Sequence, residues 1–201
     1  MKLKLYHGTS SVHLDNILRS GIRPRYNKKS EWKCASKDNM IYLTNAYPIH
    51  FAQHSALNNG GEPIIFEVEV DSDRLYPDED FLEQASFYIL QGLSMKQRTK
   101  YFRNNLENYK NHYNDSIKFL GNCCHKGYIN KKQIIRYVIP DKKSIAFSDP
   151  SITIENYRTM GDYYLHLIQI MFDKKEPQSY WEYKGYDKIN FKDLENKQLI
   201  K

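Results

Sequence analysis

The chain has 201 residues, of which 40% are hydrophobic and 27% charged, as in an ordinary globular protein with one substantial core. It contains no run of about 18 apolar residues and its start lacks the apolar region of a signal peptide. These features argue against a membrane partner and predict a cytoplasmic protein, or one delivered by a route that leaves no N-terminal mark. The net charge of +6 and the pI near 9.0 are a soft indication of an anionic partner.

Cysteine and tyrosine usage add two indications. Cys34, Cys123 and Cys124 are an odd number with two adjacent members, so they predict neither a disulfide framework nor a metal site and fit a reducing compartment.

The chain also has 17 tyrosines, and residues 98–103 interleave aromatic with basic side chains. That pattern suits a surface that pairs phosphates and stacks bases, and it equally suits a solvated helix face over an aromatic core.

The N-terminal segment predicts a strand followed by a short helix. Residues 2–6 alternate in polarity and lead directly into His7-Gly8-Thr9. Ser10 or Ser11 can cap a helix whose apolar residues share one face, and Gly21 is its expected end. The polar, basic stretch that follows has no regular pattern.

Strand and helix patterns then alternate. Residues 40–44 predict a short apolar strand, the stretch over 47–57 a helix, and Gly60-Gly61 a turn. Residues 63–70 alternate as a strand does. In this strand Glu67 and Glu69 belong to the side expected to meet solvent.

The middle of the chain is predicted to be helical. Apolar residues recur at helical spacing over 81–89 and 102–120, where the aromatic side chains are expected in the core. Glycines bracket an expected loop over 121–127, and residues 133–139 form a β-branched strand pattern that Pro140 ends.

The simplest organisation is one α+β unit. Residues 1–150 are expected to form the main domain. The stretch over 151–201 contains a further helical pattern from Thr153 to Met171 and is expected to pack on the same domain as a C-terminal helix and tail.

The order of these motifs resembles the PARP-like branch of the ADP-ribosyltransferase family. The resemblance rests on a strand that enters His7-Gly8-Thr9, a helix ending at Gly21-Ile22-Arg23-Pro24, a basic loop, and the strand Ile41-Tyr42-Leu43-Thr44 followed by a helix. It covers residues 5–70 and extends to 139. It implies a split antiparallel β core with helical insertions, and NAD⁺ as co-substrate.

The resemblance also implies roles for individual residues. His7 would bond a hydroxyl of the adenosine ribose, the backbone of Gly8 would pair with the nicotinamide carboxamide, and Tyr42 would stack on the nicotinamide ring. Arg23 would pair with pyrophosphate or ribose oxygens. Taken singly, Tyr42 fits a core aromatic and Arg23 a solvated loop residue equally well. Weaker cofactor contacts are implied for Thr9, Ser10, Asn16 and Phe51.

The third catalytic position departs from the Glu that the family often has. The resemblance places it at Gln133, at the start of the strand over 133–139. Glutamine can hydrogen-bond ribose but cannot act as a carboxylate base. Three explanations stay open: Gln133 suffices for an already nucleophilic acceptor, a carboxylate such as Asp115 acts from nearby, or the third residue lies elsewhere.

The segment over 121–132 lies where members of this family recognise their acceptor. His125, Lys126, Lys131 and Lys132 are basic and Tyr128 is aromatic, which favours a nucleic acid with an unstacked base, although a solvated charged loop has the same composition. The expected function is mono-ADP-ribosylation of RNA or single-stranded DNA, in a toxin or phage-defence effector with an antitoxin or chaperone as partner. Alternatives are a protein target, a tRNA 2′-phosphotransferase and a non-catalytic NAD-binding module.

Overall fold

The core of the protein is one antiparallel sheet. The computed structural model describes residues 1–26, 36–86 and 90–139, so Cys34 and the helix and tail expected over 151–201 lie outside the described residues. Six strands pair in the order β4-β5-β2-β1-β3-β6. Their bounds are β1 Lys2–Ser10, β2 Met40–Thr44, β3 Pro63–Asp71, β4 Leu75–Pro77, β5 Asn122–Lys126 and β6 Ile134–Val138.

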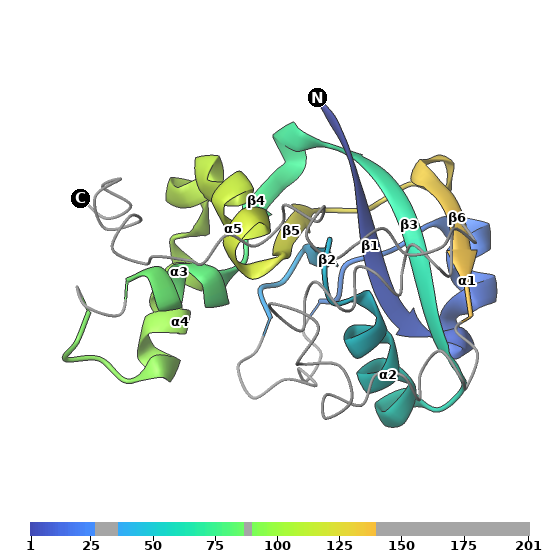
Figure 1. Ribbon diagram of the computed structural model, residues 1–201, viewed down its shortest axis with the longest axis horizontal. Helices are drawn as coiled ribbons and strands as arrows, with labels where there is room; N and C mark the ends of the chain where they lie inside the picture. Colours follow the sequence, from blue (N-terminus) through green and yellow to red (C-terminus); the bar gives the residue numbers. More distant parts are fainter. Residues whose placement is uncertain (27–35, 87–89, 140–201) are drawn as a thin grey trace, which may run out of the picture.

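Helices cover the sheet, and the α+β class expected from the sequence is confirmed (Figure 1). The α-helices are α1 Leu14–Ser20, α2 Pro48–Asn59, α3 Glu79–Ala85, α4 Met95–Asn104 and α5 Tyr113–Leu120. The described residues also form four 3₁₀ segments: η1 Ser11–His13, η2 Ser72–Arg74, η3 Leu106–His112 and η4 Lys131–Gln133. Within the described ranges, none of the helices is both long and apolar enough to cross a bilayer.

The sheet is split between its two central strands. β1 is paired with β3 along its whole length, from Lys2 opposite Asp71 to Ser10 opposite Pro63. Across the other edge of β1, the described residues pair with β2 only where Tyr6 lies opposite Thr44. The sheet therefore consists of a β1-β3-β6 half and a β2-β5-β4 half that meet at one point. We call the boundary between β1 and β2 the seam.

Two hydrophobic clusters stabilise the halves. In β2 successive side chains point to opposite faces of the sheet. Ile41 and Leu43 join the cluster that contains Leu5 of β1 and Ile17 of α1. Met40 joins the other cluster, under α3, α4 and η3, against which Tyr42 also packs.

The first helical segment begins and ends as the sequence predicts. The Ser10 side chain accepts a hydrogen bond from the backbone N–H of Val12 and caps η1, which continues into α1. Gly21, with φ +81°, ends α1, because this backbone conformation is costly for residues that have a Cβ. His7-Gly8-Thr9 lies inside β1 rather than after it, since β3 pairs with every residue of that strand.

Two other expectations are wrong. The segment predicted as a loop contains strand β5, which pairs with β2 so that Cys124 lies opposite Tyr42. Both faces of β5 are covered, since Cys123 belongs to one hydrophobic cluster and Cys124 to the other, so its residues lack an apolar/polar alternation. Glu67 is buried rather than exposed and forms an ion pair with Arg136 of β6.

Candidate active site

His7 lies at the seam and connects the two half-sheets. Its Nδ1 is 3.1 Å from the carbonyl oxygen of Tyr42. A carbonyl can only accept a hydrogen bond, so this contact requires the proton on Nδ1 and leaves a lone pair on Nε2. The His7 side chain, from β1, is thereby bonded to the backbone of β2 close to the position where the two strands pair, Tyr6 opposite Thr44.

Burial lowers the pKa of His7 to about 4, and the positive charges of Arg25 and His13 lower it further, while the Tyr42 carbonyl opposes the shift. The imidazole is therefore neutral at pH 7. Because the guanidinium of Arg25 is cationic at pH 7, its position near His7 favours an anion beside His7.

The Tyr42 hydroxyl is bonded to a carboxylate on the same half of the sheet. It donates to Oε1 of Glu79 over 2.6 Å and accepts from the backbone N–H of Lys37 over 3.0 Å. The same N–H lies 3.2 Å from Glu79 Oε1. Burial, the neighbouring Cys124 and the acidic groups nearby raise the pKa of Tyr42 well above its usual value, so the phenol keeps its proton.

Glu79 is held in place by the start of α3. It is the first residue of that helix and is only 3% exposed. Asp78 caps the helix by accepting from the backbone N–H of Asp80 over 2.9 Å, and burial raises the pKa of Asp78 well above its usual value. The Sγ of Cys124 lies 3.7 Å from Glu79 Oε2. Sequence reasoning missed Glu79; the run Asp78-Glu79-Asp80 after a strand was the available signal.

A glycine is required at position 8 because α2 packs directly against the β1 backbone there. An ideal Cβ at Gly8 would lie 2.2 Å from the Pro48 carbonyl oxygen and 2.6 Å from the Ala52 nitrogen. Phe51, which was predicted to contact the cofactor, lies on the same helix, with its Cβ 3.1 Å from that point. The helix backbone therefore fills the space beside Gly8 on its side-chain face.

The hydroxyls of Thr9 and Ser10 both have partners inside the protein. Thr9 Oγ1 is 3.5 Å from Ser55 Oγ of α2, and the Ser10 hydroxyl donates to the carbonyl of Gly60. Both residues are buried, Ser10 completely. The prediction that they line a cofactor cleft is not supported by these positions, because a ligand would have to displace an internal partner.

Asn16 and Arg23 lie on the outer surface. Asn16 accepts a hydrogen bond from Arg19 on the exposed side of α1. Arg23 is exposed and follows Ile22, which bridges to Ile129. The arginine whose charge acts on His7 is Arg25. An arginine therefore lies near His7, as predicted, but it is Arg25 and not Arg23.

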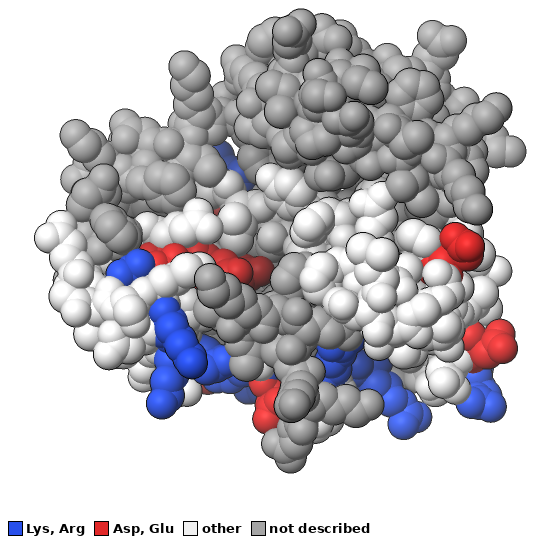
Figure 2. Space-filling view, turned by 90° about the horizontal axis from the view of Figure 1, so that it is seen from below, with Lys and Arg blue, Asp and Glu red and all other residues white. Residues whose placement is uncertain are grey.

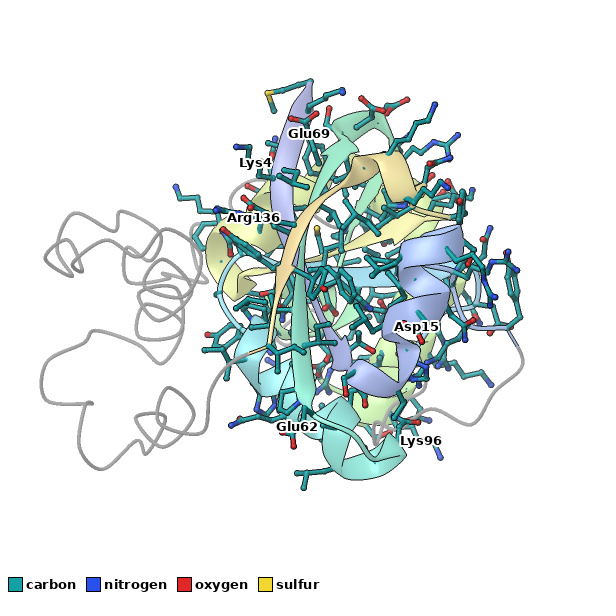
Figure 3. All side chains as sticks on the ribbon, turned by 90° about the vertical axis from the view of Figure 1, so that its right-hand side faces the viewer. Lys4, Asp15, Glu62, Glu69, Lys96 and Arg136 are labelled. Atoms are coloured by element: carbon teal, nitrogen blue, oxygen red, sulfur yellow. The ribbon has the colours of Figure 1, made fainter. Side chains whose placement is uncertain are left out.

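Gln133 does not meet His7 and Tyr42, which corrects the prediction of a third catalytic position there. Its Oε1 accepts from the backbone N–H of Asn130 over 2.9 Å, and its Nε2 donates to the carbonyl of Glu69 over 3.4 Å. Gln133 precedes β6, the outermost strand of the other half-sheet (Figure 3). The strand beside β2 is β5 instead.

The other carboxylates named from the sequence also lie elsewhere. Asp115 pairs with His112 on α5, and Glu67 pairs with Arg136. Within the described residues, no group of three or more His, Cys, Asp or Glu side chains is arranged to hold a metal ion.

The predicted acceptor segment is only partly exposed. His125 is fully buried and its pKa is lowered by burial, and Lys126 is paired with Glu107 over 2.5 Å. Tyr128, Lys131 and Lys132 are exposed. Arg98, from the basic and aromatic stretch, is buried against Glu83, whereas Lys100 and Tyr101 are exposed, so one side of that stretch faces the core and the other faces solvent.

Charge is unevenly distributed on the face shown in Figure 2. Acidic side chains lie in a recess at the left and protrude at the right-hand edge, whereas Lys and Arg gather mainly along the lower edge. An anionic ligand would therefore approach this face along its basic edge.

Comparison with known proteins leaves the family open. No family model and no curated protein matches the sequence. Among solved structures the fold is similar to EcPltA, with a TM-score of 0.41 and 13% identity over 70% of this chain and 78% of that chain. At this level the similarity indicates neither a family nor an activity.

Proposed function

We propose that the protein is an NAD⁺-dependent ADP-ribosyltransferase whose dinucleotide binds at the seam. The observation that carries the proposal is the neutral His7, which is bonded through Nδ1 to the carbonyl of Tyr42 where the two half-sheets separate. This contact places the two residues that define the His-Tyr pattern side by side, although they are 35 positions apart in the chain.

The bonding of His7 changes its expected role. Because its Nδ1–H is engaged by Tyr42, Nε2 would accept a hydrogen bond from a ribose hydroxyl rather than donate one. Arg25 would face the pyrophosphate, since its guanidinium places positive charge near His7. The partly exposed ring of Tyr42 would pack on the nicotinamide.

In the proposed reaction the bond between the nicotinamide nitrogen and the ribose anomeric carbon breaks. Its electron pair stays on the nitrogen, so nicotinamide leaves neutral, and the anomeric carbon becomes oxocarbenium-like. An acceptor oxygen or nitrogen then bonds to that carbon and releases its proton to solvent or to a base. His7 would hold the dinucleotide in the bent conformation that this step requires.

We propose a nucleic acid as the acceptor. The net charge of +6 and the exposed Tyr128, Lys131 and Lys132 support this choice. The burial of His125 and the pairing of Lys126 with Glu107 leave fewer contacts than the sequence indicated. A protein side chain is the competing acceptor.

One observation favours a second candidate, a module that binds NAD⁺ without transferring ADP-ribose. The carboxylate beside Tyr42 already accepts hydrogen bonds from Tyr42 and Lys37. Its other oxygen, Oε2, lies 3.7 Å from the Cys124 Sγ, so both oxygens of Glu79 have partners inside the protein and Glu79 fits a structural role.

The test is incubation of the full chain with NAD⁺ labelled in its adenylate phosphate and with cell lysate. We expect free nicotinamide, together with label in large molecules that nuclease releases and protease does not. Label released by protease alone would identify a protein acceptor. NAD⁺ that binds and stays intact would support the binding module, and NAD⁺ that neither binds nor breaks would contradict both candidates.

A further inference from the structure

Glu79 is a buried acidic residue whose hydrogen-bond partners are the Tyr42 hydroxyl, the backbone N–H of Lys37 and the Cys124 thiol. Oε1 accepts from the Tyr42 hydroxyl over 2.6 Å and lies 3.2 Å from the Lys37 nitrogen. Within the described ranges no Lys or Arg side chain forms an ion pair with Glu79, whereas Glu83 on the same helix is paired with Arg98. The two buried glutamates of α3 therefore differ in their partners.

Burial of Glu79 has a cost that the fold does not require. Taking a carboxylate out of water costs several kcal/mol even after relaxation, and an apolar side chain of similar volume is often at least as stable. Apolar residues of the same helix and of α4, including Phe81, Leu82 and Phe102, form the hydrophobic cluster on this side of the sheet. The distinctive contribution of Glu79 is a short hydrogen bond, 2.6 Å long, that it accepts from the Tyr42 hydroxyl.

Tyr42 is fixed at two points by two different residues. Its carbonyl accepts from His7 across the seam, and its hydroxyl donates to Glu79 on the far side of the ring. Lys37 also contributes, because its backbone N–H reaches the Tyr42 hydroxyl and its Nζ donates to the carbonyl of Arg103 over 2.6 Å. Rotation of the phenol would break the bonds to both Glu79 and Lys37.

We infer that Glu79 is a positioning residue for Tyr42: by accepting the hydrogen bond of the phenol, it holds the ring in the orientation in which it packs on nicotinamide. This inference rests on the proposed function. The role needs an acceptor oxygen and not a negative charge. Glu79→Gln keeps such an oxygen and Glu79→Ala does not.

The experiment measures kcat and KM for nicotinamide release together with the melting temperature. We expect Glu79→Gln to stay within about 3-fold of the unaltered protein and Glu79→Ala to lose about 10- to 100-fold in kcat/KM, as misplacement of a binding group does. In a Tyr42→Phe background Glu79→Ala should have less than about a 3-fold further effect, because the hydroxyl it holds is already absent.

Glu83→Gln is the matched control on the same helix. It disrupts a buried ion pair and should lower the melting temperature, but it should leave kcat/KM unchanged at temperatures where the variant is folded. A Glu79→Gln variant as inactive as Glu79→Ala would overturn the inference, because it would show that the carboxylate acts directly. Full activity in folded Glu79→Ala would overturn it as well.

A second readout does not depend on activity. In protein labelled with ¹³C at the tyrosine ring, with the Tyr42 signal assigned by Tyr42→Phe, we expect the signal to move in Glu79→Ala and to stay near its position in Glu79→Gln. If the unaltered protein cleaves no NAD⁺, the proposed function fails while this measurement still decides whether Glu79 positions Tyr42. An unmoved signal in Glu79→Ala would overturn the inference on its own.

Discussion

The two halves of the sheet differ in what they bury. The β1-β3-β6 half is built on a continuous ladder, and its one buried charged side chain among the described residues is Glu67, paired with Arg136. The β2-β5-β4 half has shorter strands and lies under α3, α4 and α5 (Figure 1). Its buried charged or titratable polar side chains include Asp78, Glu79, Glu83, Arg98 and His125.

We call the β1-β3-β6 half the supporting half. Most of the buried charged side chains among the described residues belong to the other half, β2-β5-β4, and to the helices that cover it. Burial of apolar side chains and a long ladder of backbone hydrogen bonds stabilise a strand without fixing the positions of particular polar side chains beside it. Buried polar groups cost stability unless they are bonded, and their positions are correspondingly specific. His7 comes from the supporting half, and Tyr42 with its partner Glu79 from the other.

The largest effect is expected where the supporting half meets α2. Gly8→Ala would place a Cβ 2.2 Å and 2.6 Å from backbone atoms of α2, so the helix must move and the free energy of unfolding should fall by about 3 kcal/mol or more. Chemical denaturation measures this. Gly92→Ala is the control, because its Cβ would meet nothing within 4 Å. A fully stable Gly8→Ala variant would show that α2 does not depend on Gly8.

The next largest effect should follow from loss of the Tyr42 ring. Tyr42→Ala removes the stacking surface and leaves Glu79 without its phenol partner, so nicotinamide release should fall about 100-fold, equivalent to about 2.7 kcal/mol. The control is Tyr137→Ala on the outer strand of the supporting half, where the side chain is 43% exposed. Equal activities for the two variants would contradict the placement of the site at the seam.

A smaller effect is expected on the pH dependence of stability. The pKa of His7 is lowered to about 4 in the folded state from an ordinary value of 6.5. The unfolded chain therefore takes up a proton first as the pH falls, and stability is lost between pH 6.5 and pH 4. After allowance for partial exposure of the ring, the loss should be about 2 kcal/mol.

Denaturation of the unaltered protein and of His7→Gln across this range measures the effect. The difference between the two free energies of unfolding should change with pH between 6.5 and 4 and be constant above that range. A difference that does not change would mean that the His7 side chain is not held neutral at the seam.

The smallest effect is expected at Gln133. Gln133→Ala removes a capping contact with Asn130 and should cost about 1 kcal/mol of stability, with nicotinamide release changed by less than about 2-fold because the residue lies on the outer edge of the supporting half. Nicotinamide release and melting temperature can be measured on the same samples. A loss of activity larger than that of Tyr42→Ala would restore Gln133 to the catalytic site.

Local patterns determined much of the supporting half. The strands over 2–6 and 63–70, the cap at Ser10 and the end of α1 at Gly21 all follow from short-range rules, and the structure has each of these elements, although β3 is buried along nearly its whole length. β5 was missed because both of its faces are covered, so its residues carry no alternation. Glu67 was misplaced because the strand that covers it, β6, lies far along the chain.

By itself, the sequence determined the α+β class, the positions of β1, β2, β3, α1 and α2, and the pair His7 and Tyr42 as residues to examine. Only the tertiary structure decided what those residues touch. The strand beside β2 is β5 and not the strand after Gln133, the arginine near His7 is Arg25, and the carboxylate beside Tyr42 is Glu79. The physical reason is that helix and strand patterns are fixed by neighbours along the chain, whereas a site is made by long-range pairing that short-range patterns do not encode.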